Sequence, residues 1–292
     1  MDGIININKP KGLTSSQVVT QVKRAINVSK AGHTGTLDPN ATGVLPICIG
    51  KATRLASIIT SGNKTYKAEL ILGITTNTED ITGDIIKNQK VTQTSGEIVD
   101  AIMSFEGCIS QVPPMYSAIK VNGNRLYTLA RKGKVVERKA RNVNIFSIRI
   151  CEEVTKQGTV IEVCCSPGTY IRTLCNDIGK KLGCGATMGN LQRTKVSSFS
   201  INNAYNLQDL SYFAKSFLIP PSEVLQQYAE LTIMQQAVKF LQNGNKISKN
   251  YVVKPCIPLK QNSMFRIYDS ERNFFGLYKV INDVLAPEIY LG

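Results

Sequence analysis

The chain has 292 residues, of which 42% are hydrophobic and 19% are charged. This length allows one large domain or two smaller ones, and the hydrophobic share is enough for a buried core, which excludes a disordered or fibrous protein. The formal net charge of +14 indicates a polyanion or an anionic surface as partner. With one His in the whole chain, His-rich metal sites and relays of several histidines are excluded as well.

The apolar stretches and the Cys residues indicate where the protein works. No stretch approaches the roughly 18 uninterrupted apolar residues of a membrane helix, and we expect no signal peptide at the start of the sequence. The eight Cys form no C-x-x-C pair, which argues against a structural zinc site. Cys residues in apolar surroundings, such as Cys48, are typical of small core residues that stay reduced in the cytoplasm. The sequence does not exclude a Cys thiol as a nucleophile. The composition predicts a cytoplasmic protein that faces RNA or DNA and leaves open whether it is an enzyme.

The first fifty residues predict a strand, a helix and a second buried strand. Alternating Ile residues indicate the first strand, and a Pro and a Gly end it. A Ser or Thr before an apolar stripe of helical spacing indicates the helix. The expected elements are a strand at 3–8, a helix capped by Thr14 or Ser15 and ending near Ile26, a Gly-rich loop at 30–43, and a buried run at 43–49.

Residues 51 to 105 continue the mixture of helix and strand. We expect an amphipathic helix at 51–60, a strand at 66–72, a polar loop at 75–84, and a helix that Ser95 caps and that ends near Phe105.

The next segment completes a sheet. Residues 135–165 predict two or three strands in succession, and 169–182 predict a helix closed by Gly183. Strands and helices without regular βαβ alternation indicate an α+β fold with a mixed sheet, rather than a doubly wound one.

The last part of the chain predicts a second, smaller unit. Pro220 and Pro221 indicate a boundary, because paired prolines interrupt both helix and sheet. A short helix at 232–242 and strands at 265–268 and 274–280 follow. About 65 residues suffice for a small β-rich module, which is more stable when docked on a larger neighbour.

Half of the net charge lies in one short segment. Residues 120–141 hold eight basic side chains against the single acidic Glu137, for a net charge of +7. A solvated basic face is the usual explanation of such a run. Here Tyr127 interrupts it and Tyr116 precedes it, and aromatic rings can stack on bases. With glycines at 123 and 133, the segment favours an extended arm that contacts phosphates.

The most unusual stretch is Gly32–Pro46, which reads GHTGTLDPNATGVLP. Asp38-Pro39-Asn40 is a good β-turn opening, and the ordinary explanation is a turn in which Asp38 bonds its own backbone. The surrounding glycines and the apolar run after them would instead let a ligand approach a single carboxylate closely. The stretch is not a phosphate loop, and its GxxG, typical of KH modules, is a weak signal.

Several motifs together give the sequence a family resemblance. They are KPKGLTSS from Lys9, the stretch 32–46, KTYK from Lys64, PPMYSA from Pro113 and GTYIRTL from Gly168, in that order. Over residues 3 to about 200 the chain resembles the TruB family, the bacterial tRNA pseudouridine-55 synthases. The resemblance implies a catalytic domain over 1–222 with a mixed, largely antiparallel central sheet and flanking helices, the pseudouridine synthase fold. A small PUA-type RNA-binding domain over 226–292 would follow it.

The resemblance also implies a reaction and its central residues. The family isomerises one uridine in the tRNA T loop: the N1–C1′ bond breaks, the uracil turns over, and C5 joins C1′. No metal, nucleotide or redox cofactor is implied. Asp38 would be the essential carboxylate, which either attacks covalently or removes a sugar proton. Arg172 would pair with it, and Tyr66 would stack on the target uracil and in many accounts handle the proton at C5.

The resemblance implies further site residues, whose motifs are less specific. His33 would lie near the position that the flipped base vacates, Lys9 would be a charge close to the site or a phosphate, and three residues would line the uracil pocket, namely Tyr170, Ile171 and Leu191. The segment 120–141 would be the insertion that grips the T loop. Its RNA-binding side chains would be Lys120, Arg125, Arg131, Lys132, Arg138, Lys139 and Arg141.

Alternatives of other classes remain open from the sequence. A non-catalytic tRNA-binding protein or folding chaperone could use the same basic surface. A guide-RNA-dependent relative would share the aspartate loop, whereas the insertion and the short chain favour a stand-alone enzyme that acts as a monomer without guide RNA. A Cys-based redox or metal protein would need clustered Cys.

Overall fold

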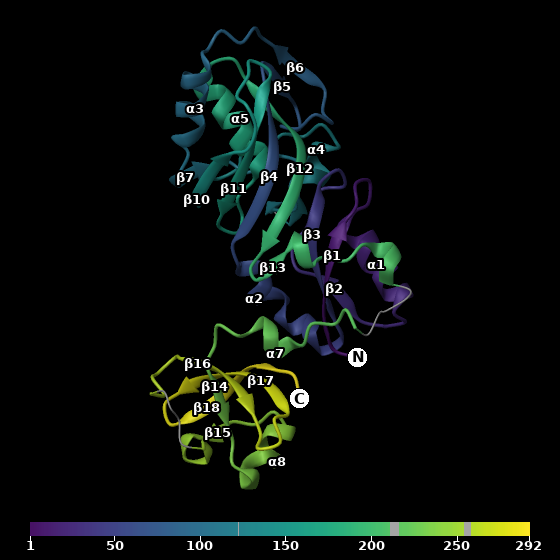
Figure 1. Cartoon of the computed structure of the whole chain (residues 1–292), viewed down its shortest axis with the longest axis vertical. Helices are drawn as coiled ribbons and strands as arrows, with labels where there is room; N and C mark the ends of the chain where they lie inside the picture. Colours follow the sequence, from purple (N-terminus) through teal and green to yellow (C-terminus); the bar gives the residue numbers. More distant parts are fainter. Residues whose placement is uncertain (122, 211–215, 254–257) are drawn as a thin grey trace.

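A computed structural model describes residues 1–121, 123–210, 216–253 and 258–292. Asn122, within the expected insertion, and Cys256 lie outside the described residues. The larger of the two main sheets has nine strands, with seven in the order β1-β3-β12-β4-β11-β10-β7 and with β2 and β13 added to β3 and β12 (Figure 1). Its strands are β1 (Gly3–Lys9), β2 (Ala31–His33), β3 (Thr42–Ile49), β4 (Lys64–Leu72), β7 (Gly107–Gln111), β10 (Arg141–Ile150), β11 (Gly158–Cys165), β12 (Ala186–Val196) and β13 (Phe199–Ser200). Within this sheet only β3 and β12 are paired in parallel, which confirms the predicted mixed, largely antiparallel sheet.

Helices pack on both halves of this sheet. They are α1 (Ser15–Ala25), α2 (Ala56–Ser61), α3 (Ser95–Met103) and α5 (Ile171–Leu182), with a 3-10 turn at Gly50–Leu55 before α2. The apolar side of α1 packs on β1 and β3 through Val18 and Val22, and α5 packs on β4 and β11 through Leu174 and Ile178. Figure 1 shows α3 and α5 side by side on the part of the sheet that β4 and β11 form.

The helix ends differ from the prediction in detail. Thr14 caps α1, with Gln17 completing a capping box, so of the two expected caps Thr14 is the one used. Thr94 rather than Ser95 caps α3, because its hydroxyl accepts from the backbone of Glu97, three residues on. Helix α5 begins at Ile171 and ends at Leu182, and the φ of 79° at the following Gly183 provides the left-handed cap that the sequence predicts.

Two segments contain structure that the sequence pattern did not predict. The polar loop is flanked by β5 (Ile74–Thr76) and β6 (Ile85–Asn88), which pair as a hairpin. The expected extended arm contains β8 (Lys120–Val121), β9 (Asn124–Arg125) and the short helix α4 (Leu126–Ala130). The prediction of an extended arm is therefore wrong at α4, whose first residue, Leu126, is fully buried.

The C-terminal part forms a second sheet of five strands in the order β14-β16-β17-β18-β15. Its elements are α7 (Pro221–Val224), β14 (Glu230–Thr232), α8 (Val238–Gln242), β15 (Ile247–Ser248), β16 (Met264–Tyr268), β17 (Phe274–Ile281) and β18 (Val284–Tyr290). The expected helix at 232–242 is wrong at its start, because Thr232 ends strand β14 beside β16. The sequence pattern also missed β18, which pairs with both β17 and β15.

The two sheets share one hydrophobic cluster. Leu55 and Ile59 of the first unit pack with Leu225 and Leu277 of the second. Lys51 Nζ also donates to the carbonyl of Gly292 at 2.7 Å. The predicted module is thus docked on its larger neighbour, whereas the division into functional domains at 1–222 and 226–292 stays a prediction. Within the described ranges, no helix is long and apolar enough to span a membrane.

Candidate active site

The turn that carries Asp38 lies between β2 and β3 and is held by hydrogen bonds within the turn and to Gly12 and Ser15. The Asp38 carbonyl accepts from Ala41 N at 3.1 Å, which closes the turn. The Pro39 carbonyl accepts from Gly12 N at 2.8 Å. Ser15, in the first turn of α1, exchanges two hydrogen bonds with the backbone of Leu37, at 2.9 and 3.1 Å. Leu37 is buried while the Asp38 side chain is 44% exposed, so the turn anchors its backbone and presents its carboxylate.

Lys9 is hydrogen-bonded to the backbone of this turn. Its side chain is fully buried, and its amine donates to the carbonyls of Pro10, Leu13 and Pro39 at 2.6–3.0 Å. Burial lowers the pKa of Lys9 to about 8, the nearby Asp38 charge opposes that shift, and the Arg193 charge adds to it. Lys9 therefore lies beside the Asp38 turn, with its amine directed at backbone carbonyls.

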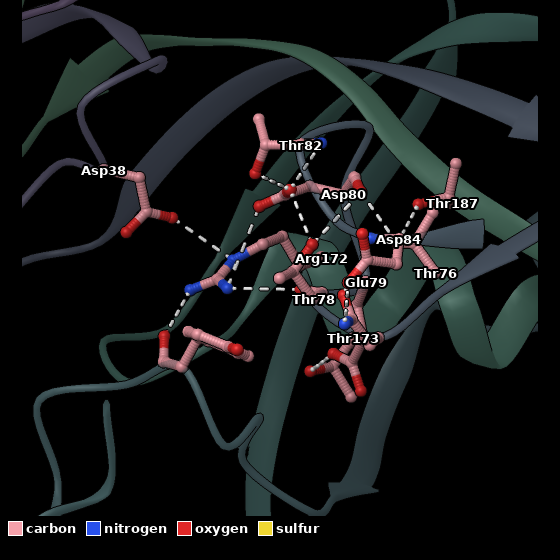
Figure 2. A network of polar contacts seen from close by, with 12 residues as sticks. Asp38, Thr76, Thr78, Glu79, Asp80, Thr82, Asp84, Arg172, Thr173 and Thr187 are labelled. Atoms are coloured by element: carbon pink, nitrogen blue, oxygen red, sulfur yellow. Dashed lines mark hydrogen bonds and ion pairs between the residues drawn. The ribbon is translucent and has the colours of Figure 1, made fainter. Parts of the chain in front are cut away.

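Arg172 lies at the centre of the polar network in Figure 2. Its Nε is 3.2 Å from Oδ2 of Asp38, and its side chain is only 7% exposed. Nη2 donates to the Tyr116 carbonyl at 2.8 Å and Nη1 to the Thr78 carbonyl at 3.3 Å. Three chain segments thus fix the guanidinium, and the guanidinium in turn orients the Asp38 carboxylate.

Asp80 is a second carboxylate at the site that sequence reasoning missed. Its Oδ2 is 3.9 Å from Nη1 of Arg172, on the other side of the guanidinium from Asp38 (Figure 2). Its Oδ1 accepts from the Thr78 hydroxyl at 2.8 Å, and from the backbone and hydroxyl of Thr82 at 2.9 and 2.6 Å. The pattern Thr78-Glu79-Asp80-Ile81-Thr82 is the signal that could have indicated it, since Thr hydroxyls two residues to either side can hold an Asp in a loop.

Tyr66 and Arg193 face each other across neighbouring strands. Tyr66 on β4 is half-buried and pairs in register with Arg193 on β12. Burial raises the pKa of the Tyr66 phenol, and the Arg193 guanidinium opposes that shift. Arg193 is 1% exposed and donates to the carbonyls of Val44 at 2.8 Å and Gly35 at 3.2 Å, which joins the two arms of the Asp38 loop. Sequence reasoning missed Arg193 as well.

Asp38 and Leu191, which the sequence predicted as site residues, line one pocket together with Asp80, whereas the other predicted site residues do not line it. Ile171 is 4% exposed and belongs to the main core. Tyr170 is the residue before α5, and its backbone is hydrogen-bonded to the Gln111 side chain. His33 ends β2, and burial and the Arg193 charge lower its pKa, which leaves the imidazole neutral at physiological pH. The remaining lining is Lys11, Asn40, Ala41, Ile81, Thr82, Met188, Gly189 and Asn190.

The expected RNA-binding side chains lie mostly exposed on the segment after Tyr116. Arg125 and Arg131 lie over the Tyr127 ring, with guanidinium carbons 5.9 and 5.7 Å from its centroid. Arg138 differs, because it is half-buried and donates to the Pro113 carbonyl at 3.0 Å. The other expected residues are exposed, namely Lys120, Lys132, Lys139 and Arg141.

Comparisons with known proteins identify the family. Residues 23–171 match the model of the TruB family pseudouridylate synthase N-terminal domain, and residues 172–219 match the tRNA pseudouridylate synthase B C-terminal domain. The chain belongs to the TruB family. It is 48% identical to tRNA pseudouridine synthase B of Alkaliphilus oremlandii over 87% of this chain and 85% of the relative. It is 47% identical to the protein of the same name from Clostridium acetobutylicum over 95% of both chains.

Solved structures agree with the TruB assignment. The chain is similar to one in a Cbf5-Nop10-Gar1 complex, with a TM-score of 0.73, 29% identity, and coverage of 96% of this chain and 78% of that one. It is also similar to one in an H/ACA RNP bound to a substrate RNA, with a TM-score of 0.75, 25% identity, and coverage of 99% and 85%. The pseudouridine synthase fold is confirmed, and the protein is a tRNA pseudouridine synthase, an isomerase.

The described residues do not favour the thiol and metal alternatives. Among the described residues, no three His, Cys, Asp or Glu side chains lie close enough together to hold a metal ion. Burial raises the pKa of Cys48, Cys165 and Cys175 to about 12, so these thiols are protonated at neutral pH.

Proposed function

We propose that this enzyme isomerises uridine 55 in the T loop of tRNA, with Asp38 as its essential group. The observation that supports this role is the contact between a buried guanidinium and a partly exposed carboxylate that lines a pocket. Asp38 is 44% exposed and Arg172 is 7% exposed, with 3.2 Å between their charged atoms. A carboxylate held in one orientation, yet open to a pocket, can reach the reacting atoms of a bound nucleoside.

In the proposed reaction the target nucleotide first leaves the RNA stack, because a paired or stacked base hides its sugar from a carboxylate. The N1–C1′ bond then breaks, the uracil turns over, C5 bonds to C1′, and the hydrogen on C5 is lost while N1 gains one. Asp38 either adds covalently or removes a sugar proton. Tyr66 stacks on the uracil, and its raised pKa keeps the phenol protonated at neutral pH.

The basic segment after Tyr116 is proposed to hold the T stem-loop. Its exposed cations can contact phosphates. The five-stranded C-terminal unit is proposed as a PUA-type domain that contacts another part of the tRNA. We further propose that the enzyme acts as a monomer without guide RNA.

Purified protein alone, incubated with an unmodified T-arm stem-loop, tests the proposal. We expect pseudouridine at position 55 from the wild type, whereas Asp38→Asn should bind the RNA with unchanged affinity and lose activity by at least ~10³-fold. Asp100→Asn is the matched control, because Asp100 is exposed on α3, and it should keep full activity. Modification by Asp38→Asn would refute the role of Asp38, and activity only after addition of a guide RNA would refute independence from a guide.

A further inference from the structure

Glu79, which precedes Asp80 in the loop between β5 and β6, has an unusual backbone. Its φ is 64°, in the left-handed region that residues other than Gly rarely adopt. Its N–H donates to the Thr76 carbonyl at 3.3 Å, and its carbonyl accepts from Met188 N at 3.1 Å. A residue held in a disfavoured conformation beside reacting groups suggests a function that outweighs the strain.

The Glu79 side chain crosses to helix α5, which carries Arg172. Its Oε2 accepts from the Thr173 hydroxyl at 2.6 Å, and its Oε1 accepts from Asn176 Nδ2 at 3.4 Å. Figure 2 shows Glu79 and Thr173 next to each other in the same network as Arg172 and Asp80. Both partners on α5 are buried, so this carboxylate reaches into the interface between the loop and the helix rather than into solvent.

Two neighbouring sets of contacts thus join the β5–β6 loop to helix α5. In the first, Arg172 contacts the Thr78 carbonyl at 3.3 Å and the Asp80 carboxylate at 3.9 Å. In the second, the Glu79 carboxylate accepts from the Thr173 hydroxyl at the shorter distance of 2.6 Å. Of the hydrogen bonds and ion pairs described between this loop and the start of α5, the two longer ones would remain without the Glu79 carboxylate. The Thr173 hydroxyl would also lose its acceptor in a buried place.

We propose that Glu79 is a positioning residue for the isomerisation. Its carboxylate holds the β5–β6 loop, which carries Asp80, against α5 and thereby keeps Arg172 in contact with Asp38. The inference rests on the proposed roles of Asp38 and Arg172. The hydrogen bonds of the Glu79 carboxylate go to Thr173 and Asn176, neither of which lines the pocket. The contribution of Glu79 is the geometry of the guanidinium, so it acts on the chemical step and leaves RNA binding unchanged.

The test measures kcat, KM and thermal stability of Glu79→Ala, Glu79→Gln and Thr173→Val on the T-arm stem-loop. We expect Glu79→Ala to lower kcat about tenfold with KM within about twofold of the wild type. Glu79→Gln should retain most of the activity, because its amide oxygen can still accept from Thr173. Thr173→Val removes the same hydrogen bond from the other side and should lower kcat to a similar degree, so it decides the question even if Glu79→Ala fails to fold.

Glu97→Ala is the matched control, because Glu97 also accepts from a Thr hydroxyl, in the capping box of α3. It should lower the melting temperature and leave kcat unchanged. An unchanged kcat in Thr173→Val, or a Glu79→Gln variant as inactive as Glu79→Ala, would overturn the proposal. Asp38→Asn is measured in parallel: if it stays active, the proposed function itself fails, whatever the Glu79 variants do.

Discussion

The amine of Lys9 is a buried cation next to the Asp38 turn, with only backbone carbonyls as its hydrogen-bond acceptors. Burying an ammonium group disfavours its charged form, and the pKa of Lys9 falls from 10.5 to about 8. Between these two pH values the unfolded chain binds more protons at Lys9 than the folded chain does. Stability that is linked to this residue therefore rises with pH over this window and is constant below it.

Lys9→Met tests this linkage. Loss of three hydrogen bonds should make the variant less stable than the wild type at pH 7. We expect the stability difference to widen from about pH 8 to about pH 10, because the variant lacks the gain in stability that is linked to Lys9. Urea unfolding followed by circular dichroism measures it, and the similarly shifted Lys64 cancels because both proteins contain it. A difference that stays constant with pH would contradict a lowered pKa of Lys9.

At the scale of elements, the parallel pairing of β3 with β12 positions the Asp38 loop. Gly43, at the start of β3, pairs with Arg193 and has a φ of 101°. A Cβ at this position would lie 2.2 Å from the Arg193 carbonyl oxygen, which is backbone and cannot rotate away. The close approach of the two strands therefore requires Gly at this position.

Gly43→Ala should separate the strands and destabilise the protein by more than about 3 kcal/mol, with loss of most activity. Gly12→Ala is the control: Gly12 has a similar φ of 91°, but nothing lies within 4 Å of its Cβ position. Its cost should be only the conformational one of about 1–2 kcal/mol. Urea unfolding gives both values, and equal destabilisation by the two substitutions would show that close strand approach is unimportant.

At the scale of the whole molecule, the two sheets depend on a common core. Leu277 on β17 is fully buried in the cluster that contains Leu55 and Ile59 of the larger unit. A cavity at such a position weakens the packing of both units, because their side chains line it together. We therefore expect the catalytic unit to lose stability when the C-terminal unit is altered.

Leu277→Ala should destabilise the protein by about 2–5 kcal/mol and lower the temperature at which catalytic activity is lost. Ile281→Ala, on the same strand but 40% exposed, should cost less than about 1 kcal/mol. The measurements are thermal inactivation on the T-arm stem-loop and circular dichroism, since the chain has no Trp for fluorescence. Unchanged inactivation in Leu277→Ala would show that the two units unfold independently.

The sequence by itself determined the local features of this protein. Alternating apolar residues predicted β1 and β4, the Thr14 cap and apolar stripe predicted α1, and the ordered motifs identified the TruB family. These signals are local, because strand and helix periodicity and capping depend on residues a few positions apart. The boundaries near Ser95 and Thr232 were wrong where a neighbouring cap or a distant strand competed with the local pattern.

Only the tertiary structure decided what surrounds Asp38. Arg172 contacts the Thr78 carbonyl from 94 positions away, and Arg193 bonds the Val44 carbonyl from 149 positions away. Neither contact has a local signature, because it depends on strand register and on the packing of α5. For the same reason Glu79 and Arg193 look like ordinary polar residues in the sequence. Their place at the site follows from distant segments that meet when the sheet forms, since burial leaves each polar group only the partners that the fold brings to it.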